Sequence, residues 1–121
     1  MALQQLVKAE WRSYCDRISR GLAGGSAELE VVSLDLGDHV EARWVPLYGI
    51  VYDPKSGVLE IALEGIDHLI DRPRDLYVEE TSRGLVAVEI VAEDETRQIV
   101  KLREPLVLPA ALPRRRGTVE S

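Results

Sequence analysis

Residues 50–63 read IVYDPKSGVLEIAL, and this stretch carries the clearest fold signal in the chain. Its middle predicts a turn, because Pro54 presets φ and Gly57 can take a positive φ. After the turn, every second residue is a large apolar one, which is the period of a half-buried strand. These residues are Leu59, Ile61 and Leu63. The stretch therefore predicts a β-hairpin. The short connection requires antiparallel pairing, because a parallel crossover needs a dozen or more residues.

Alternation also marks the segment upstream of this hairpin. Residues 28–31 and 32–36 each alternate apolar with polar side chains, but the two runs meet out of phase at Val31 and Val32. A shift of one residue would turn half of the strand to the wrong face, so this point predicts a β-bulge or a sharp bend. The turn of this first hairpin is expected at Gly37-Asp38.

The return strand of the first hairpin is expected at residues 39–44, with three side chains pointing inward: Val40, Ala42, Trp44. Pro46 interrupts this strand. Because proline cannot donate to a strand ladder, Pro46 predicts an edge position, a bulge or a break.

The C-terminal half predicts three further strands, at residues 76–80, 85–92 and 97–102. Between them and the central hairpin, residues 65–75 show no clear period and are expected to be irregular. Prolines recur after Glu104, so residues 105–121 are expected to be an extended or disordered tail that follows one domain of residues 1–104.

Residues 3–22 have a helical period. Their apolar side chains recur every three or four residues and would form one stripe: Leu3, Val7, Trp11, Tyr14, Ile18, Leu22. Gly24 and Gly25 follow and can end the helix. A one-sided sheet needs a cover, so the sequence predicts an α+β fold, with an N-terminal amphipathic helix packed on a bent, mostly antiparallel sheet of about six strands. Closure into a barrel is left open.

Composition limits the classes of function. The 121-residue chain has no Phe and a formal net charge of −6, and an acidic surface disfavours nucleic acid as a partner. The longest basic run, Arg114 to Arg116, is only a weak electrostatic signal for nucleic-acid binding. Cys15 is the one cysteine, so no intrachain disulfide can form. No apolar run predicts a signal peptide or a membrane span, and a cytoplasmic, non-membrane protein is expected.

Four motifs carry a resemblance to a known family. They are WRSYCDRISRGL at residues 11–22, SLDLGD at 33–38, YGIVYDP at 48–54 and LEIALEGIDHLIDRP at 59–73. In these motifs the chain is similar to a family of short uncharacterised bacterial proteins, a domain of unknown function. The likeness covers nearly the whole domain but not the tail. It implies a bacterial protein and supplies no catalytic residues.

Two groups of polar residues are candidates for a metal site: Asp67, His68 and Asp71, and Asp35, Asp38 and His39. No HExxH, CxxC or EF-hand spacing is present, so no metal or other cofactor is expected. Cys15 lies beside the apolar stripe of the helix and is expected to be a small buried hydrophobe rather than a nucleophile.

Five residues form the candidate binding site: Asp67, His68, Arg72, Arg74 and Trp44. Two guanidinium groups could clamp a carboxylate or a phosphate. The alternative is that the arginines pair with neighbouring carboxylates, as surface charges commonly do: Asp71, Asp75, Glu79. Trp44 suits either the core or a partner interface.

The sequence does not define a biochemical activity. No catalytic motif is present and strand edges must be covered, so the leading hypothesis is a non-catalytic protein-interaction or regulatory module, with a second copy or another protein as partner. The alternative is a small-molecule-binding domain or an enzyme that uses residues 67–74. A third hypothesis rests on the order of elements, which is similar to that of Sm-like RNA-binding barrels, but the net charge argues against it.

Overall fold

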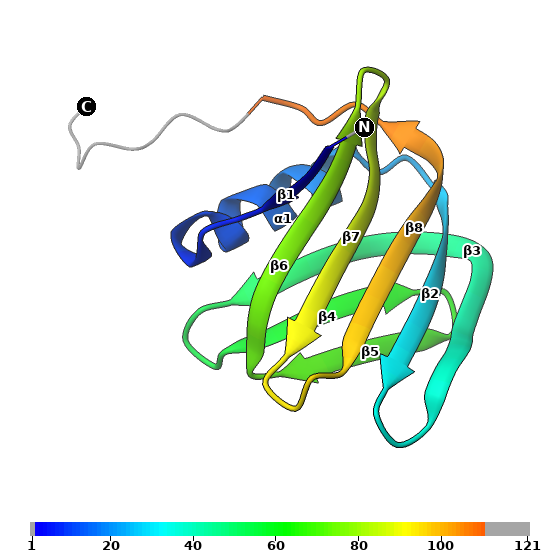
Figure 1. Ribbon diagram of the computed structural model, residues 1–121. Coiled ribbons are helices and arrows are strands. Elements are labelled where there is room, and N and C mark those ends of the chain that lie inside the picture. Colours follow the sequence, from blue (N-terminus) through cyan, green and yellow to red (C-terminus); the bar gives the residue numbers. More distant parts are fainter. Residues whose placement is uncertain (1, 111–121) are drawn as a thin grey trace.

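The computed structural model describes residues 2–110 and holds eight strands, one 3-10 turn and one α-helix (Figure 1). In chain order these are β1 (Ala2–Gln5), η1 (Lys8–Glu10), α1 (Trp11–Gly21), β2 (Ser26–Ser33), β3 (Gly37–Asp53), β4 (Val58–Leu63), β5 (Ile66–Asp71), β6 (Pro73–Thr81), β7 (Gly84–Ala92) and β8 (Arg97–Leu106). The predicted class, a mostly antiparallel sheet with one helix, is confirmed. The predicted count of about six strands is too low, because segments expected to be helical or irregular each contribute a strand.

The strands form two layers that share β3. The sheet order is β1-β6-β7-β8-β2-β3-β4-β5, and every neighbouring pair is antiparallel. The first layer extends from β1 to the first half of β3, and the second layer consists of the second half of β3 with β4 and β5. The strands of the second layer run across those of the first (Figure 1). β1 and β5 are the two ends, so the sheet is open and does not close into a barrel.

The core fills the space between the layers and beneath α1. It is built mainly from aliphatic side chains, and its aromatic members are Trp11, Tyr14 and Tyr52. The largest fully buried side chains include Trp11, Ile18, Leu29, Leu47, Ile50, Leu59, Ile61, Leu76, Leu85 and Ile90. The predicted central hairpin is confirmed, because Leu59, Ile61 and Leu63 are buried and β4 pairs with residues 47–53 of β3.

In the pairing of β2 with β3, the bulges lie on β3 and not on β2, where the sequence predicted one. β2 keeps its alternation through buried Val31, and the two register shifts each place an extra residue on β3. The predicted bulge at Val31-Val32 is therefore wrong. Of the side chains expected to point inward, Ala42 is buried but Val40 and Trp44 are each 39% exposed, because the extra residues turn them away from the core. Pro46 lies within β3 where the partner strand changes from β2 to β4, and the strand continues through it to Asp53, so the predicted break does not occur.

The first hairpin turns earlier than predicted. β2 ends at Ser33, which pairs with Gly37, and the turn consists of residues 34–36. Leu34 and Leu36 are therefore exposed rather than inward-facing. Gly37 takes a positive φ of 71°, which a residue with a side chain rarely adopts, and this position fixes the return of the chain.

The helix is half as long as predicted. α1 begins at Trp11, and its stripe of Trp11, Tyr14, Cys15 and Ile18 is buried as expected. Residues 2–5 instead form β1 against β6, which leaves Leu3 63% exposed and makes the predicted helical start wrong. The strand satisfies backbone groups through the β6 ladder, and the Leu6 amide continues this by donating to the Leu76 carbonyl at 2.9 Å.

Residues 65–75, predicted to be irregular, contain β5 and the start of β6. A two-residue turn joins β4 to β5, and its second residue, Gly65, has a positive φ of 81°, which glycine adopts without strain. The remaining predicted strands are confirmed as β6, β7 and β8. β8 continues to Leu106, and residues 109–110 lie on α1 through hydrogen bonds from Arg17 and Arg20. The rest of the predicted tail, residues 111–121, lies outside the described residues.

Candidate functional site

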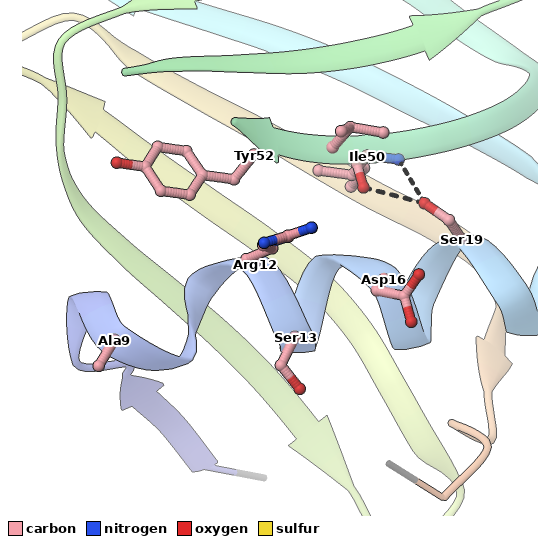
Figure 2. A pocket seen from close by; sticks show the side chains of 8 residues that line it. Ala9, Arg12, Ser13, Asp16, Ser19, Ile50 and Tyr52 are labelled. Atoms are coloured by element: carbon pink, nitrogen blue, oxygen red, sulfur yellow. Dashed lines mark hydrogen bonds between the residues drawn. The ribbon is translucent and has the colours of Figure 1, made fainter. Parts of the chain in front are cut away.

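A groove of about 620 Å³ lies between α1 and the second half of β3 (Figure 2). Its lining consists of Ala9, Arg12, Ser13, Asp16, Ser19, Ile50, Val51 and Tyr52. At one end of the groove the Ser19 hydroxyl donates to the Ile50 carbonyl at 2.9 Å and accepts from the Ile50 amide at 3.0 Å, as Figure 2 shows. Ser19 thereby supplies both partners that a neighbouring strand would give Ile50. α1 is thus a cover for this edge of β3.

The groove offers little for catalysis. Its lining has two serines, but neither His nor Cys that could form a nucleophile–base pair with them. The Ser19 hydroxyl is already bonded to the Ile50 backbone, and the Asp16 carboxylate pairs with Arg20 at 2.9 Å. Cys15 lies in the core beneath α1, where burial raises the pKa of its thiol to about 12. Its expected role as a small buried hydrophobe fits this position.

The backbone of β5 has one unpaired side. Because the N–H and C=O of Ile50 point away from β4, those of the next residue, Val51, point toward β4, and the direction alternates residue by residue across the ladders. Following the register through β4, the backbone groups of Ile66, His68 and Ile70 point toward β4. Those of Asp67, Leu69 and Asp71 point away from the sheet. β5 is the last strand in the order, so among residues 2–110 these groups form a free edge.

The outward side chains of β3–β5 form what we call the second-layer face: Val51, Glu60, Ala62, Asp67, Leu69 and Asp71. Val51, Glu60 and Leu69 are cross-strand neighbours in one row. The two apolar members of that row are exposed, Val51 at 52% and Leu69 at 59%. The same three residues of β5 that carry the free backbone edge also place their side chains on this face: Asp67, Leu69, Asp71.

Charge on the second-layer face is uncompensated. Three of its six side chains are carboxylates, Glu60, Asp67 and Asp71, and none is a cation. The neighbouring Asp67 carboxylate raises the pKa of Glu60, by hydrogen bonding and by its charge. Among residues 2–110, no ion pair reaches Glu60, Asp67 or Asp71.

The structure separates the predicted neighbours Asp67 and His68. They alternate on β5, so Asp67 lies on the outer face while His68 points inward, beside Ile61 of β4. The Nε2 atom of His68 is buried and has no hydrogen-bond partner among the described residues. Burial lowers the pKa of this imidazole, and Glu41 opposes that shift. These residues lie on a strand and not on the loop that the sequence predicted.

The two predicted arginines lie at the start of β6. Arg72 joins β5 to β6 with a φ of 49°, and its carbonyl accepts a hydrogen bond from the Glu93 amide at 3.0 Å. Arg74 pairs with Asp75 at 2.9 Å and with Glu95 at 2.6 Å. The alternative in which an arginine pairs with a neighbouring carboxylate is therefore confirmed for Arg74 and Asp75.

Trp44, the fifth candidate residue, lies at a bulge of β3 with a φ of 55°. The five predicted binding residues thus come from β3, β5 and the start of β6, and a binding role for them stays a prediction. In the second predicted group, His39 pairs with Glu41 through its Nε2 atom at 2.8 Å. Across residues 2–110, no three His, Cys, Asp or Glu side chains gather in a way that could hold a metal ion.

Sequence reasoning missed the free edge of β5 and two members of the second-layer face, Val51 and Leu69. The available signal was the alternation of apolar and acidic residues from Ile66 to Asp71. Two positions depart from it, because His68 stands where an apolar residue is expected and Leu69 where an acidic one is expected. These two exceptions hid the strand.

The fold and surface define a class: a two-layer antiparallel β structure with one helix, in which α1 covers one strand edge and another edge is free. The described residues contain no helix with the length and apolar character needed to cross a membrane. The chain belongs to the Family of unknown function (DUF5335), whose model matches residues 2–111, and the resemblance seen in the sequence motifs is confirmed.

A relative from Aquifex aeolicus (strain VF5), an uncharacterized protein, is 39% identical over 110 residues. The match covers 90% of this chain and 99% of the relative. No solved structure matches.

Proposed function

We propose that this protein is a non-catalytic interaction module that binds an extended segment of a partner protein along β5. The observation that carries this proposal is the free edge of β5, where the backbone groups of Asp67, Leu69 and Asp71 point away from the sheet. An extended peptide that adds to such an edge gains main-chain hydrogen bonds, and its alternate side chains give specificity.

The other strand edges support this choice by contrast. Proteins protect sheet edges by keeping the strand short or by covering it. β1, at the far end of the order, has four residues, and the second half of β3 is covered by α1 through Ser19. β5 has six residues and no cover among residues 2–110, and its two carboxylates, Asp67 and Asp71, oppose only strands of like charge. Exposed Leu69 lies at the centre of this edge and adds apolar area for a partner.

The test is selection of peptides from a random ten-residue display library against the full chain. Binding of the selected peptides is then compared in Leu69→Pro and Leu69→Thr variants. Proline removes the outward N–H at the centre of the free edge without removing a bond to β4. Threonine keeps that N–H and suits a strand, so it is the matched control.

We expect Leu69→Pro to weaken binding at least about tenfold, the equivalent of one or two net hydrogen bonds. Leu69→Thr should change it less. In the unaltered protein, bound peptide should slow hydrogen exchange at the amides of Asp67, Leu69 and Asp71, and this readout needs no variant to fold. Protection at the α1–β3 groove instead of β5, or a library that yields no binder, would overturn the proposal.

A further inference from the structure

Taking the proposed function as its basis, we infer that the segment bound at β5 is basic, with Lys or Arg on both sides of an apolar residue in the pattern basic–x–apolar–x–basic. The juxtaposition behind this is that the free backbone edge and the second-layer face are made by the same three residues of β5: Asp67, Leu69, Asp71.

Geometry brings the side chains of an added strand next to those of β5. A strand paired antiparallel with β5 would place its alternate side chains directly beside Asp71, Leu69 and Asp67 in turn. Side chains that face each other in such a ladder have Cβ atoms about 4.5–5.5 Å apart, close enough to interact. Two partner residues therefore meet carboxylates, and the one between them meets Leu69, which is 59% exposed next to the Val51–Glu60 row.

The charges of the second-layer face also favour a basic segment. No cation among residues 2–110 pairs with Asp67, Asp71 or Glu60. The Asp67 and Glu60 carboxylates are close enough that Asp67 raises the pKa of Glu60. A Lys or Arg brought by the added strand next to Asp67 would relieve repulsion that no cation among residues 2–110 relieves. Opposite charges facing each other across a ladder are favourable, and like charges are unfavourable.

The other occupant to consider for this edge is a second copy of the chain. The antiparallel register that uses all three outward residues of two β5 strands pairs Leu69 with Leu69 and Asp67 with Asp71 of the other copy. Both outer pairs then bring two carboxylates face to face, which opposes this dimer. The charges that discourage self-pairing are the same charges that attract a basic segment, so the observations favour a different, basic partner.

The experiment uses two synthetic probes that carry a fluorophore, one with the core Lys-Thr-Val-Thr-Lys and one with Glu-Thr-Val-Thr-Glu, and measures their anisotropy with the full chain. The test variant is Asp67→Lys with Asp71→Lys. The control is Glu10→Lys with Glu104→Lys, which makes the same change in net charge at two exposed carboxylates outside the second-layer face, one on η1 and one on β8.

We expect the unaltered protein to prefer the Lys probe by about three- to thirtyfold, as two favourable cross-strand charge pairs would give. This preference should shrink as salt is raised. The Asp67→Lys/Asp71→Lys variant should prefer the Glu probe, and the Glu10→Lys/Glu104→Lys control should still prefer the Lys probe. Peptides selected without bias should show the same basic–x–apolar–x–basic pattern.

The failures are distinguishable. If Leu69→Pro abolishes binding but selected peptides carry no basic pattern and the charge-reversed variant keeps the original preference, the edge function stands and this inference falls. If the control shifts the preference as much as the test variant does, net charge alone is responsible and the inference falls. Self-association of the full chain that Leu69→Pro removes would identify a second copy as the occupant and would also overturn it.

Discussion

The outer faces of the two layers handle charge in opposite ways. On the first layer, carboxylates have cationic neighbours: Arg97 pairs with Glu89 at 2.9 Å, and Lys101 lies 3.4 Å from Glu30. On the second layer, Glu60 lies beside Asp67 and no described cation pairs with either. On the first layer, cations of the same face pair with the carboxylates. On the second layer, no cation among residues 2–110 pairs with Glu60 or Asp67.

Two similar carboxylate pairs make the difference clear. Asp38 raises the pKa of Glu30 on the first layer, as Asp67 raises that of Glu60 on the second. Lys101 opposes the shift at Glu30, and Glu60 has no such neighbour. The layers also differ in their uncovered ends, since β1 is four residues long and β5 is six. Both differences single out the second layer: its carboxylates lack paired cations among residues 2–110, and its edge strand is the longer of the two.

The largest expected effect tests whether α1 holds the second layer in place. Trp11 is 1% exposed, its ring meets the Tyr52 ring edge-on at 5.2 Å, and its indole N–H donates to the Leu6 carbonyl. Trp11→Ala should lower the free energy of unfolding by about 3–5 kcal/mol in urea denaturation. Trp44→Ala is the control, and its loss should be clearly smaller because Trp44 is 39% exposed.

Hydrogen exchange of Trp11→Ala sharpens the comparison. Amides of β3 after Pro46, β4 and β5 should lose more protection than those of β7 and β8, because α1 packs on β3. Equal loss in both layers would show that they unfold as one unit.

A middle-sized effect tests the cover on the β3 edge. Ser19→Ala leaves both the N–H and the C=O of Ile50 without their partner, and we expect a loss of about 1–3 kcal/mol by thermal or urea unfolding. Ser13→Ala, in the same groove, should stay within about 0.5 kcal/mol. Matching values for the two serines would mean that the Ser19 hydroxyl does not protect this edge.

The smallest effects should have opposite signs on the two faces. Lys101→Met removes the cation near Glu28 and Glu30, so it should destabilise the protein at pH 7 by about 0.2–1 kcal/mol. Glu60→Gln removes one of two neighbouring carboxylates and should raise the melting temperature slightly at pH 7. The same sign for both variants would contradict the contrast between the faces.

The effect of Glu60→Gln should depend on pH. Because the folded-state pKa of Glu60 is raised, the unaltered protein loses stability as pH rises through that value, relative to a neutral side chain. The stabilisation by Glu60→Gln should therefore vanish below about pH 4, where glutamate is protonated in both folded and unfolded states. Melting temperatures of both proteins from about pH 3 to pH 8 measure this. A difference that grows toward low pH would contradict it.

Local signals predicted the elements that carry them. The Pro54–Gly57 turn and the alternation of residues 58–63 gave the central hairpin, and the buried stripe from Trp11 to Ile18 followed from the helical period. Residues 3–7 fit the same helical period, but β6 offered them a ladder, and this long-range pairing outweighed the local preference. At β3, two bulges turned Val40 and Trp44 outward, which alternation alone cannot reveal.

The candidate site was less accessible to the sequence than the fold was. Asp67 was found because it is an acid in a polar cluster, but its supposed partner His68 lies on the other side of β5. The Glu60–Asp67 proximity depends on the register of β4 with β5, and the paired state of Arg74 depends on Glu95, which is 21 residues away. Neither relation is encoded in local spacing.

By itself, the sequence determined the α+β class, the antiparallel hairpins, the acidic charge and the family, because periodicity, turn residues and composition act over a few neighbours or need no geometry. Only the tertiary structure decided which edge is covered and which carboxylates lack cations. These properties arise when residues distant in sequence meet: Ser19 with Ile50 across 31 positions, and β1 with β6 across more than 70. Packing of residues 2–110 as a whole, rather than any local preference, leaves the β5 edge free among them.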